Sequence, residues 1–148
     1  MPLWQVFYQD GAFEDAASKT ALAQDATKMY EAIGLPAFYV VVQFIKLARD
    51  DLYIGGKQNS GNPFIRIVIN HVAYVIPEEN DAMFAATVKH INAVLLPHVY
   101  VRGYDSEVHV GETDRRLWQI NGMNPPKFDS EEQKLWAEKN RPVWYDGA

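Results

Sequence analysis

The chain has 148 residues, enough for one domain with a sizeable core, and its 48% hydrophobic and 22% charged residues are typical of a globular protein. Its formal net charge of -5, without a local cluster of Lys and Arg, argues against a general nucleic-acid-binding protein. The absence of cysteine excludes disulfides, thiolate metal sites and cysteine nucleophiles. The sequence shows neither a signal peptide nor an apolar run long enough to cross a bilayer, so we expect a cytoplasmic protein.

The first residues, MPLWQVFYQ, predict a β-strand from Pro2 to Tyr8. A Met-Pro start normally loses its methionine, which would leave Pro2 with a free secondary amine. Two interpretations of Pro2 are open at this point. It is either a strand opener, where a missing N–H costs little, or the carrier of a catalytic amine.

A first β-α-β unit follows from the apolar periodicity. Residues 14–33 predict a helix, which Gly34 and Pro36 end, and residues 37–47 are apolar on both faces, as in a buried parallel strand. The helix places five residues on one face, namely Leu22, Ala26, Met29, Tyr30 and Ile33.

The same order of elements recurs in the second half of the chain. Residues 63–72 predict a strand that again opens on proline, and Pro77 with two following acids predicts the start of a helix. The apolar face of this helix lies 62 residues after that of the first one and consists of Phe84, Val88, Ile91 and Leu95. We therefore expect a single domain over residues 1–148, with a pseudo-repeat of residues 2–60 and 63–122.

The remaining segments are less regular. The turn-rich residues 51–63 predict a short extra strand, and the closing strand of the second unit is either HVYVRG or, as we favour, SEVHVGE. Residues 129–148 predict a C-terminal helix and tail, with Ser130 and Gln133 in capping-box spacing. Trp144 and Tyr145 are too apolar for a free tail, so we expect them to dock on a neighbouring surface.

Together these elements predict an α/β (α+β) fold, in which two fused β-α-β units form a four-stranded sheet with helices on one face. The opposite face of such a sheet is also apolar and needs cover. A closed oligomer provides that cover most simply.

The sequence resembles the tautomerase superfamily, and within it the branch of cis-3-chloroacrylic acid dehalogenase and its fungal-type relatives. The likeness rests on the MP start, the duplicated β-α-β plan, LYIGG at residues 52–56, and VHVGE at residues 108–112, followed after eight residues by NG. It implies a homotrimer whose terminal proline lies in a pocket near a subunit boundary. It also implies chemistry without a cofactor, in which the proline amine moves protons between keto and enol forms.

Beyond Pro2, the residues of the dehalogenase site are replaced. Met29 stands where the family has a catalytic histidine, and His71 and Tyr74 stand where two arginines hold the substrate carboxylate. His109 replaces a tyrosine, and Ile120 replaces the glutamate that activates water. Without that glutamate a hydrolytic dehalogenase has no base, so we reject dehalogenation as the native activity.

The resemblance implies a cofactor-independent tautomerase that acts on a small 2-oxo or enol acid, such as an aryl enolpyruvate. Pro2 and His109 are the expected catalytic residues, although a lone strand histidine is also a common surface residue. The expected substrate-binding residues are His71, Tyr74, Gln119, Asn121 and Met29. Asn121 and the glycine after it could equally form a plain turn. No metal site is expected, since the histidines show neither HxxxH nor HxH spacing.

Two alternatives keep the same fold. The loss of the partner residues also fits a non-catalytic trimeric binding or scaffold protein. A decarboxylase or hydratase of the superfamily, with proline as the acid, is the other alternative. It lacks an identified residue that would activate water.

Overall fold

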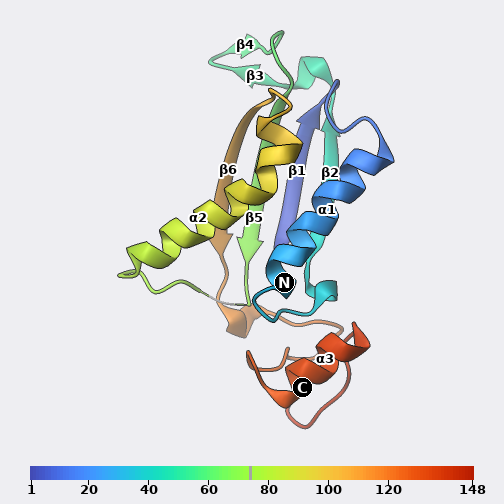
Figure 1. The fold of residues 1–148 in the computed structure, drawn as a ribbon, viewed down its shortest axis with the longest axis vertical. Coiled ribbons are helices and arrows are strands. Elements are labelled where there is room, and N and C mark those ends of the chain that lie inside the picture. Colours follow the sequence, from blue (N-terminus) through green and yellow to red (C-terminus); the bar gives the residue numbers. More distant parts are fainter. Residues whose placement is uncertain (74) are drawn as a thin grey trace.

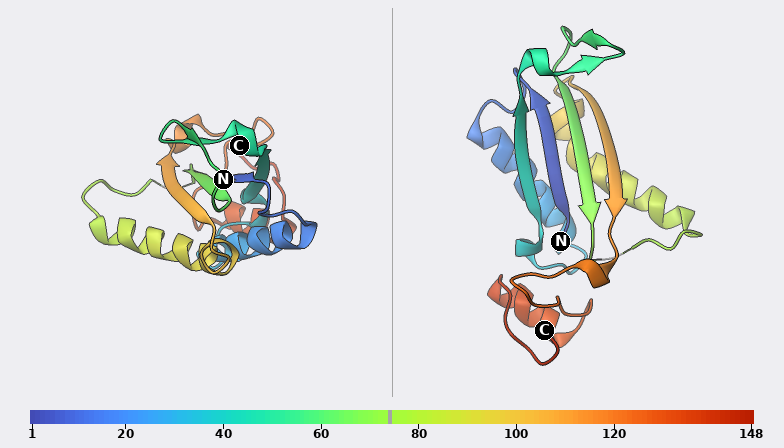
Figure 2. Two further views of the ribbon diagram at one scale, coloured as in Figure 1. Left: turned by 90° about the horizontal axis from the view of Figure 1, so that it is seen from above. Right: turned by 180° about the vertical axis from the view of Figure 1, so that it is seen from behind.

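The structure is a computed structural model that describes residues 1–73 and 75–148. Its main sheet contains β1 (Leu3–Gln9), β2 (Val41–Leu47), β5 (Phe64–His71) and β6 (Asp105–Glu112) in the order β2-β1-β5-β6. β1 runs parallel to β2 and antiparallel to β5, and β5 runs parallel to β6. Both long helices, α1 (Ala16–Glu31) and α2 (Asp81–Leu95), cover one face of the sheet (Figures 1 and 2). The predicted fold class is confirmed.

Side-chain caps set the starts of both long helices. The Asp15 carboxylate accepts a hydrogen bond from the Ser18 N–H at 2.7 Å and begins α1. Asn80 caps α2 in the same way, by accepting from the Met83 N–H at 3.0 Å. The predicted start of this helix at Pro77 is therefore wrong, because Pro77 instead accepts a turn hydrogen bond from the Asn80 N–H at 2.9 Å.

The predicted buried strand over residues 37–47 is only partly correct. Its first residues form a 3₁₀ turn, η1 (Ala37–Tyr39), and the strand β2 begins at Val41. β2 is also an edge strand, because β1 is its one neighbour in the sheet, and Gln43 and Lys46 are exposed. The apolar run reflects burial of Tyr39 in the core rather than burial of both faces of a strand.

The core lies between the sheet and the helices. Its fully buried members include Trp4, Val6, Leu22, Ala26, Ile65, Ile67, Ile69 and Leu95. The predicted core face of α2 enters this core only at Ile91 and Leu95, whereas Phe84 and Val88 remain 40% and 52% exposed. The reason is that the first half of α2 extends past the edge of the sheet (Figures 1 and 2).

The second β-α-β unit closes as predicted through SEVHVGE, which forms β6. The competing segment HVYVRG instead continues α2 into a π-helical turn, η3 (Leu96–Tyr100). Between the two units, β3 (Tyr53–Ile54) and β4 (Lys57–Gln58) form a small separate hairpin. None of the helices in the described part of the chain is long and apolar enough to span a membrane.

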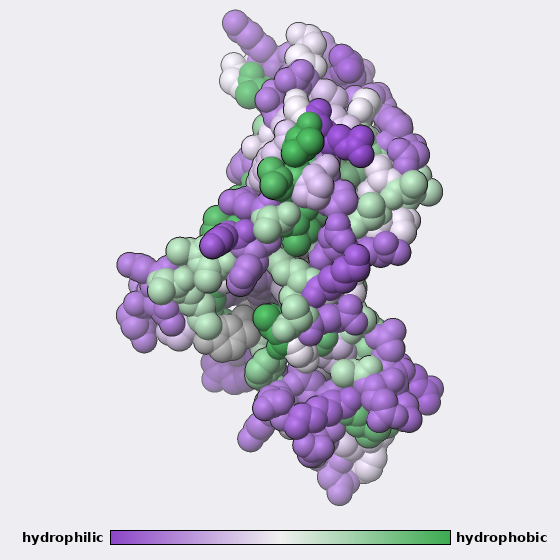
Figure 3. All heavy atoms as spheres, in the orientation of Figure 1, coloured by the Kyte–Doolittle hydropathy of each residue, from purple (hydrophilic) through white to green (hydrophobic). Residues whose placement is uncertain are grey.

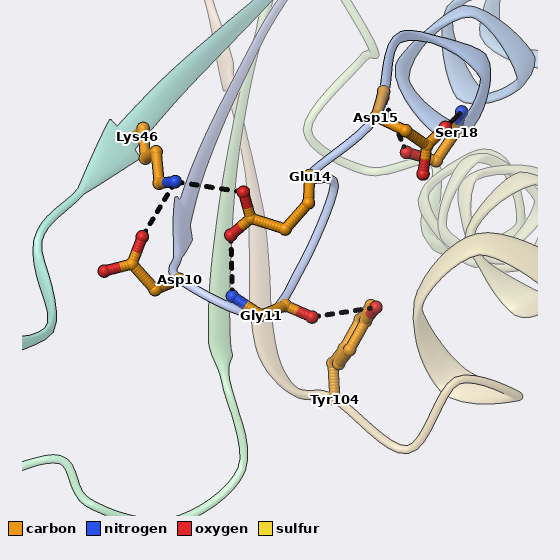
Figure 4. Close-up of polar contacts among 7 residues, drawn as sticks. All are labelled: Asp10, Gly11, Glu14, Asp15, Ser18, Lys46 and Tyr104. Carbon is orange, nitrogen blue, oxygen red and sulfur yellow. Dashed lines mark hydrogen bonds and ion pairs between the residues drawn. The ribbon is translucent and has the colours of Figure 1, made fainter.

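The turn between β1 and α1 is held by a polar network at the end of β1 away from Pro2 (Figure 4). Lys46 contacts Asp10 and Glu14 at 2.8 and 3.0 Å, and Glu14 accepts from the Gly11 N–H at 2.8 Å. Gly11 has a φ of 96°, a conformation that favours glycine. Because these charges are exposed, each ion pair adds little stability.

The C-terminal helix α3 (Glu131–Lys139) begins as predicted, with the Ser130 hydroxyl accepting from the Gln133 N–H at 3.2 Å. It packs below the edge of the sheet where β1 begins (Figure 1). Of the two aromatic residues in the tail, only Tyr145 docks within the chain, and its hydroxyl donates to the Asn124 carbonyl at 2.7 Å. Trp144 is 70% exposed, so the prediction holds for Tyr145 alone.

Candidate active site

The sheet topology brings three chemically useful residues to one edge. β1 begins at the edge where β5 and β6 end, and the register pairs Leu3 with Asn70, and His71 with Glu112. One step before Leu3, the same register places Pro2 opposite His71. Because side chains alternate along a strand and Trp4 faces the helices, Pro2, His71 and Glu112 belong to the helix-covered face.

A cavity of about 270 Å³ opens at this edge. Its lining comes from the residue before β1, α1 and the turn after it, the ends of β5 and β6, the segment after β5, and α2. It consists of Pro2, Met29, Tyr30, Ile33, Leu35, His71, Val72, Ala73, Ile76, Met83, Ala86, Thr87, His90 and Glu112. In the space-filling view the surface is hollowed between α2 and the lobe that carries α3, with hydrophobic atoms around the hollow (Figure 3). Among the described residues the lining includes neither Lys nor Arg, so the cavity suits a largely apolar ligand.

A chain of hydrogen bonds connects the core to the cavity wall. The indole Nε1–H of Trp4 donates to the Tyr30 hydroxyl at 3.0 Å, and this hydroxyl lies 2.6 Å from Nε2 of His71. Burial raises the pKa of Tyr30, so its hydroxyl keeps its proton. Burial also lowers the pKa of His71, an effect that the Glu112 carboxylate opposes.

Glu112 gives the cavity its carboxylate. One of its oxygens accepts a hydrogen bond from the Ile76 N–H at 2.9 Å, which ties the segment after β5 to the end of β6. Its side chain neighbours His71 across the parallel strand pair. Glu112 therefore both shapes the cavity and places a negative charge beside the imidazole.

The amino-terminal end is buried in an unusual way. The Pro2 side chain is fully buried and lines the cavity. Met1 is not among the residues that line it. Burial, together with the nearby Arg115 guanidinium, lowers the pKa of the Met1 α-amine to about 4. The Met1 α-amine is therefore neutral near pH 7.

The predicted site residues divide between two places. His71 and Met29 line the cavity with Pro2. His109 lies on the open face of the sheet, in register with Val68 and in a separate hollow of about 620 Å³, so a single chain does not bring it to Pro2. Tyr74 lies outside the described residues.

Gln119 and Asn121 do not line the cavity either. Both are exposed, and they lie beside a short bridge between Ile120 and Met123. Asn121 has a φ of 51°, in the left-handed region that asparagine tolerates in turns. This geometry fits the plain-turn interpretation of the Asn121 position.

Several polar residues of the cavity were not predicted as site residues, among them the two that contact or neighbour His71, Tyr30 and Glu112. Tyr30 stood among the apolar residues of the first helix, and Glu112 closed the VHVGE motif, but neither signal indicated a role in a site. Strand register places Glu112 beside His71, and the packing of α1 on the sheet places Tyr30 there. In the described part of the chain, no group of three or more acidic or histidine side chains gathers in a way that could hold a metal ion.

A proline-headed strand, a duplicated β-α-β plan and an apolar cavity at the strand ends define a tautomerase-type fold. Residues 1–141 match the family described as "putative oxalocrotonate tautomerase enzyme", and the chain belongs to this family of the tautomerase superfamily.

Solved structures agree with this assignment. The chain is 35% identical to native RhCC from Rhodococcus jostii RHA1, with a TM-score of 0.88 over 97% of this chain and 99% of that one. It is 38% identical to a probable enzyme from the thermophilic fungus Aspergillus fumigatus, with a TM-score of 0.88 over 98% of each chain.

A more distant structure shares the fold alone. It is N1, a member of the cis-3-chloroacrylic acid dehalogenase family, which is 18% identical with a TM-score of 0.60 over 93% of this chain and 97% of that one. None of the curated proteins matches this chain.

Proposed function

We propose that this protein is a cofactor-independent tautomerase whose catalytic group is the secondary amine of Pro2 after removal of Met1. The observation that carries the proposal is the position of Pro2, buried at the head of β1 and lining an apolar cavity beside His71. The same surroundings that lower the pKa of the Met1 amine are expected to lower the pKa of a Pro2 terminus.

The proposed reaction interconverts the enol and keto forms of a small 2-oxo acid that carries an apolar, for example aryl, side chain. The neutral amine takes the proton from the enol hydroxyl and then returns a proton to the neighbouring carbon, so that only O–H and C–H bonds change. A base with a pKa near the working pH suits both steps. The aryl group would occupy the apolar walls formed by Met29, Leu35 and Ile76.

The site residues predicted from the sequence have different roles in the proposed reaction. His71 is the proposed partner for the substrate oxygen, and Met29 is part of the apolar wall. His109 can contribute only if a second copy of the chain brings its open sheet face to the cavity of the first. Gln119 and Asn121 have no role in the proposed reaction within one chain.

The test is the ketonisation of an aryl enolpyruvate by protein confirmed by mass spectrometry to begin at Pro2. We expect a rate well above that of buffer and a large loss in Pro2→Ala, which replaces the rigid secondary amine with a flexible primary one. Rates equal to buffer for both proteins would contradict this reaction and would favour the non-catalytic binding or scaffold alternative.

We also propose that the protein is a homotrimer. Two fused 4-OT proteins with a similar fold, F6 and Q0, form trimers. In support, half-buried apolar residues such as Leu3, Phe7 and Val68 alternate with buried core residues along β1 and β5 and so lie on the opposite face of the sheet. Neither α1 nor α2 covers that face (Figure 2). Light scattering during gel filtration should give three times the chain mass of 16.9 kDa. A single-chain mass at micromolar concentration would contradict the trimer.

A further inference from the structure

The buried hydroxyl of Tyr30 has two hydrogen-bond neighbours, and these neighbours fix its direction. The Trp4 indole nitrogen can only donate, so the Tyr30 oxygen accepts from it at 3.0 Å. Tyr30 is only 4% exposed, so its own proton also needs a partner. Among the described residues, that partner is Nε2 of His71 at 2.6 Å.

A histidine nitrogen that accepts a hydrogen bond carries no proton. His71 is then a neutral imidazole with its proton on Nδ1. Both the imidazolium cation and the other neutral tautomer carry a proton on Nε2. In either form that proton would face the Tyr30 hydroxyl, which already accepts from Trp4, and the buried hydroxyl proton would lose its partner.

We propose that Tyr30, held by Trp4, is a positioning residue that fixes His71 as a neutral donor, and that His71 Nδ1–H binds the keto or enolate oxygen of the substrate. The inference rests on the proposed function for the identity of that oxygen. The tautomer itself rests on the hydrogen-bond chain alone.

Several charged and titratable groups surround the His71 ring. Glu112 faces it from β6, the amino terminus from the head of β1, and Tyr30 from α1, while His90 lines the same cavity from α2. Glu112 favours the cation, but burial outweighs it and lowers the pKa of His71.

The consequence for recognition is specific. A neutral Nδ1–H can hydrogen-bond a carbonyl oxygen, and it can stabilise negative charge that develops on that oxygen in the enolate. It supplies no full positive charge for a carboxylate, and the described lining of the cavity contains neither Lys nor Arg. His71 therefore recognises the reacting oxygen of the substrate, and it does not replace the family's carboxylate-binding arginine.

The tautomer can be read directly from ¹⁵N shifts of the histidine rings in the folded protein at pH 7. We expect the His71 ring, assigned by the loss of its signals in His71→Asn, to show a protonated Nδ1 and an unprotonated Nε2. Tyr30→Phe removes one oxygen and should shift the ring toward a mixture of both tautomers. Tyr100→Phe is the matched control, because its hydroxyl bonds Asn92 away from the cavity and should leave the His71 pattern unchanged.

The kinetics of aryl enolpyruvate ketonisation provide a second test of the tautomer. The amide N–H of His71→Asn can occupy the place of Nδ1–H, whereas that of His71→Gln lies nearer the place of Nε2. We expect His71→Asn to keep a kcat at least about tenfold higher than that of His71→Gln, the effect of one hydrogen bond worth about 1.4 kcal/mol. Tyr30→Phe should lower kcat more than it raises KM.

Two results would overturn the inference, namely a protonated Nε2 in the wild-type protein, or a His71→Gln variant more active than His71→Asn. The proposed function and the proposed tautomer of His71 can be rejected independently. Absence of ketonisation by the wild-type protein would reject the proposed function, whereas the nitrogen shifts decide the tautomer without any substrate.

Discussion

A variant with one alanine inserted between Met1 and Pro2 is expected to ketonise an aryl enolpyruvate about 10²–10⁴-fold more slowly than protein that begins at Pro2, the range for loss of a positioned acid–base group. In the inserted variant the proline nitrogen is part of a peptide bond and has no basic lone pair. A terminal amine is still present, but it is displaced from the cavity wall. The insertion therefore removes the proposed base while keeping every side chain of the cavity.

The pH dependence of the same reaction has a defined sign. The reaction needs the unprotonated amine, so kcat/KM should rise as pH increases through the pKa of the Pro2 amine and then reach a plateau. Because burial lowers the pKa of an amine at this end of the chain, the rise should occur below the ordinary range of an α-amine, which is near ~8. The inserted variant should lack this rise.

Pro63→Ala is the matched control for this experiment. Pro63 heads the second β-α-β unit as Pro2 heads the first, but it does not line the cavity. Its substitution should leave the ketonisation rate unchanged within about twofold, since surface changes away from a site have small effects. Equal rates for the inserted variant and for protein beginning at Pro2 would remove the proline amine from the mechanism.

Trp136→Ala is expected to lower the free energy of unfolding by about 3–5 kcal/mol, the usual cost of removing a buried aromatic side chain. The Trp136 ring is fully buried, with Phe38, Tyr39 and Tyr145 packed at centroid distances of 6.0 to 6.3 Å. Its indole N–H also donates to the Val143 carbonyl at 2.6 Å. The substitution would leave both a cavity and an unpaired carbonyl.

The Trp136→Ala substitution is also expected to affect the candidate active site. Phe38 and Tyr39 belong to η1, which leads directly into β2, where the Val41 N–H donates to the Pro2 carbonyl at 3.0 Å. Trp136 therefore supports the segment that holds Pro2 in place. We expect Trp136→Ala to lower ketonisation as well as stability.

Trp144→Ala is the matched control, because it removes the same kind of side chain from the tail that follows α3. Its side chain is 70% exposed, so its removal should change the unfolding free energy by less than about 0.5 kcal/mol. Urea unfolding followed by circular dichroism measures both variants. Similar losses for the two tryptophans would contradict the view that α3 is anchored through Trp136.

The repeating pattern of the sequence was sufficient to predict the fold. Apolar spacing along α1 and α2, the prolines at the heads of β1 and β5, and the capping residues before α3 each reflect local rules that act within a few residues. Errors arose where a competing local interaction was stronger than the pattern. The Asn80 side chain capped α2 after Pro77 had indicated an earlier start, and η1 interrupted the apolar run before Val41.

The sequence by itself determined most of the elements and their order, and it indicated Pro2 and His71 as candidate site residues, because helix periodicity, strand alternation and the family motifs are local properties of the chain. Only the tertiary structure decided which side chains meet. The antiparallel pairing of β1 with β5 placed Pro2 beside His71, and alternation along β6 put Glu112 on their side of the sheet and His109 on the other. These contacts depend on strand register and on which face each residue occupies, and both are set by packing between residues far apart in the sequence.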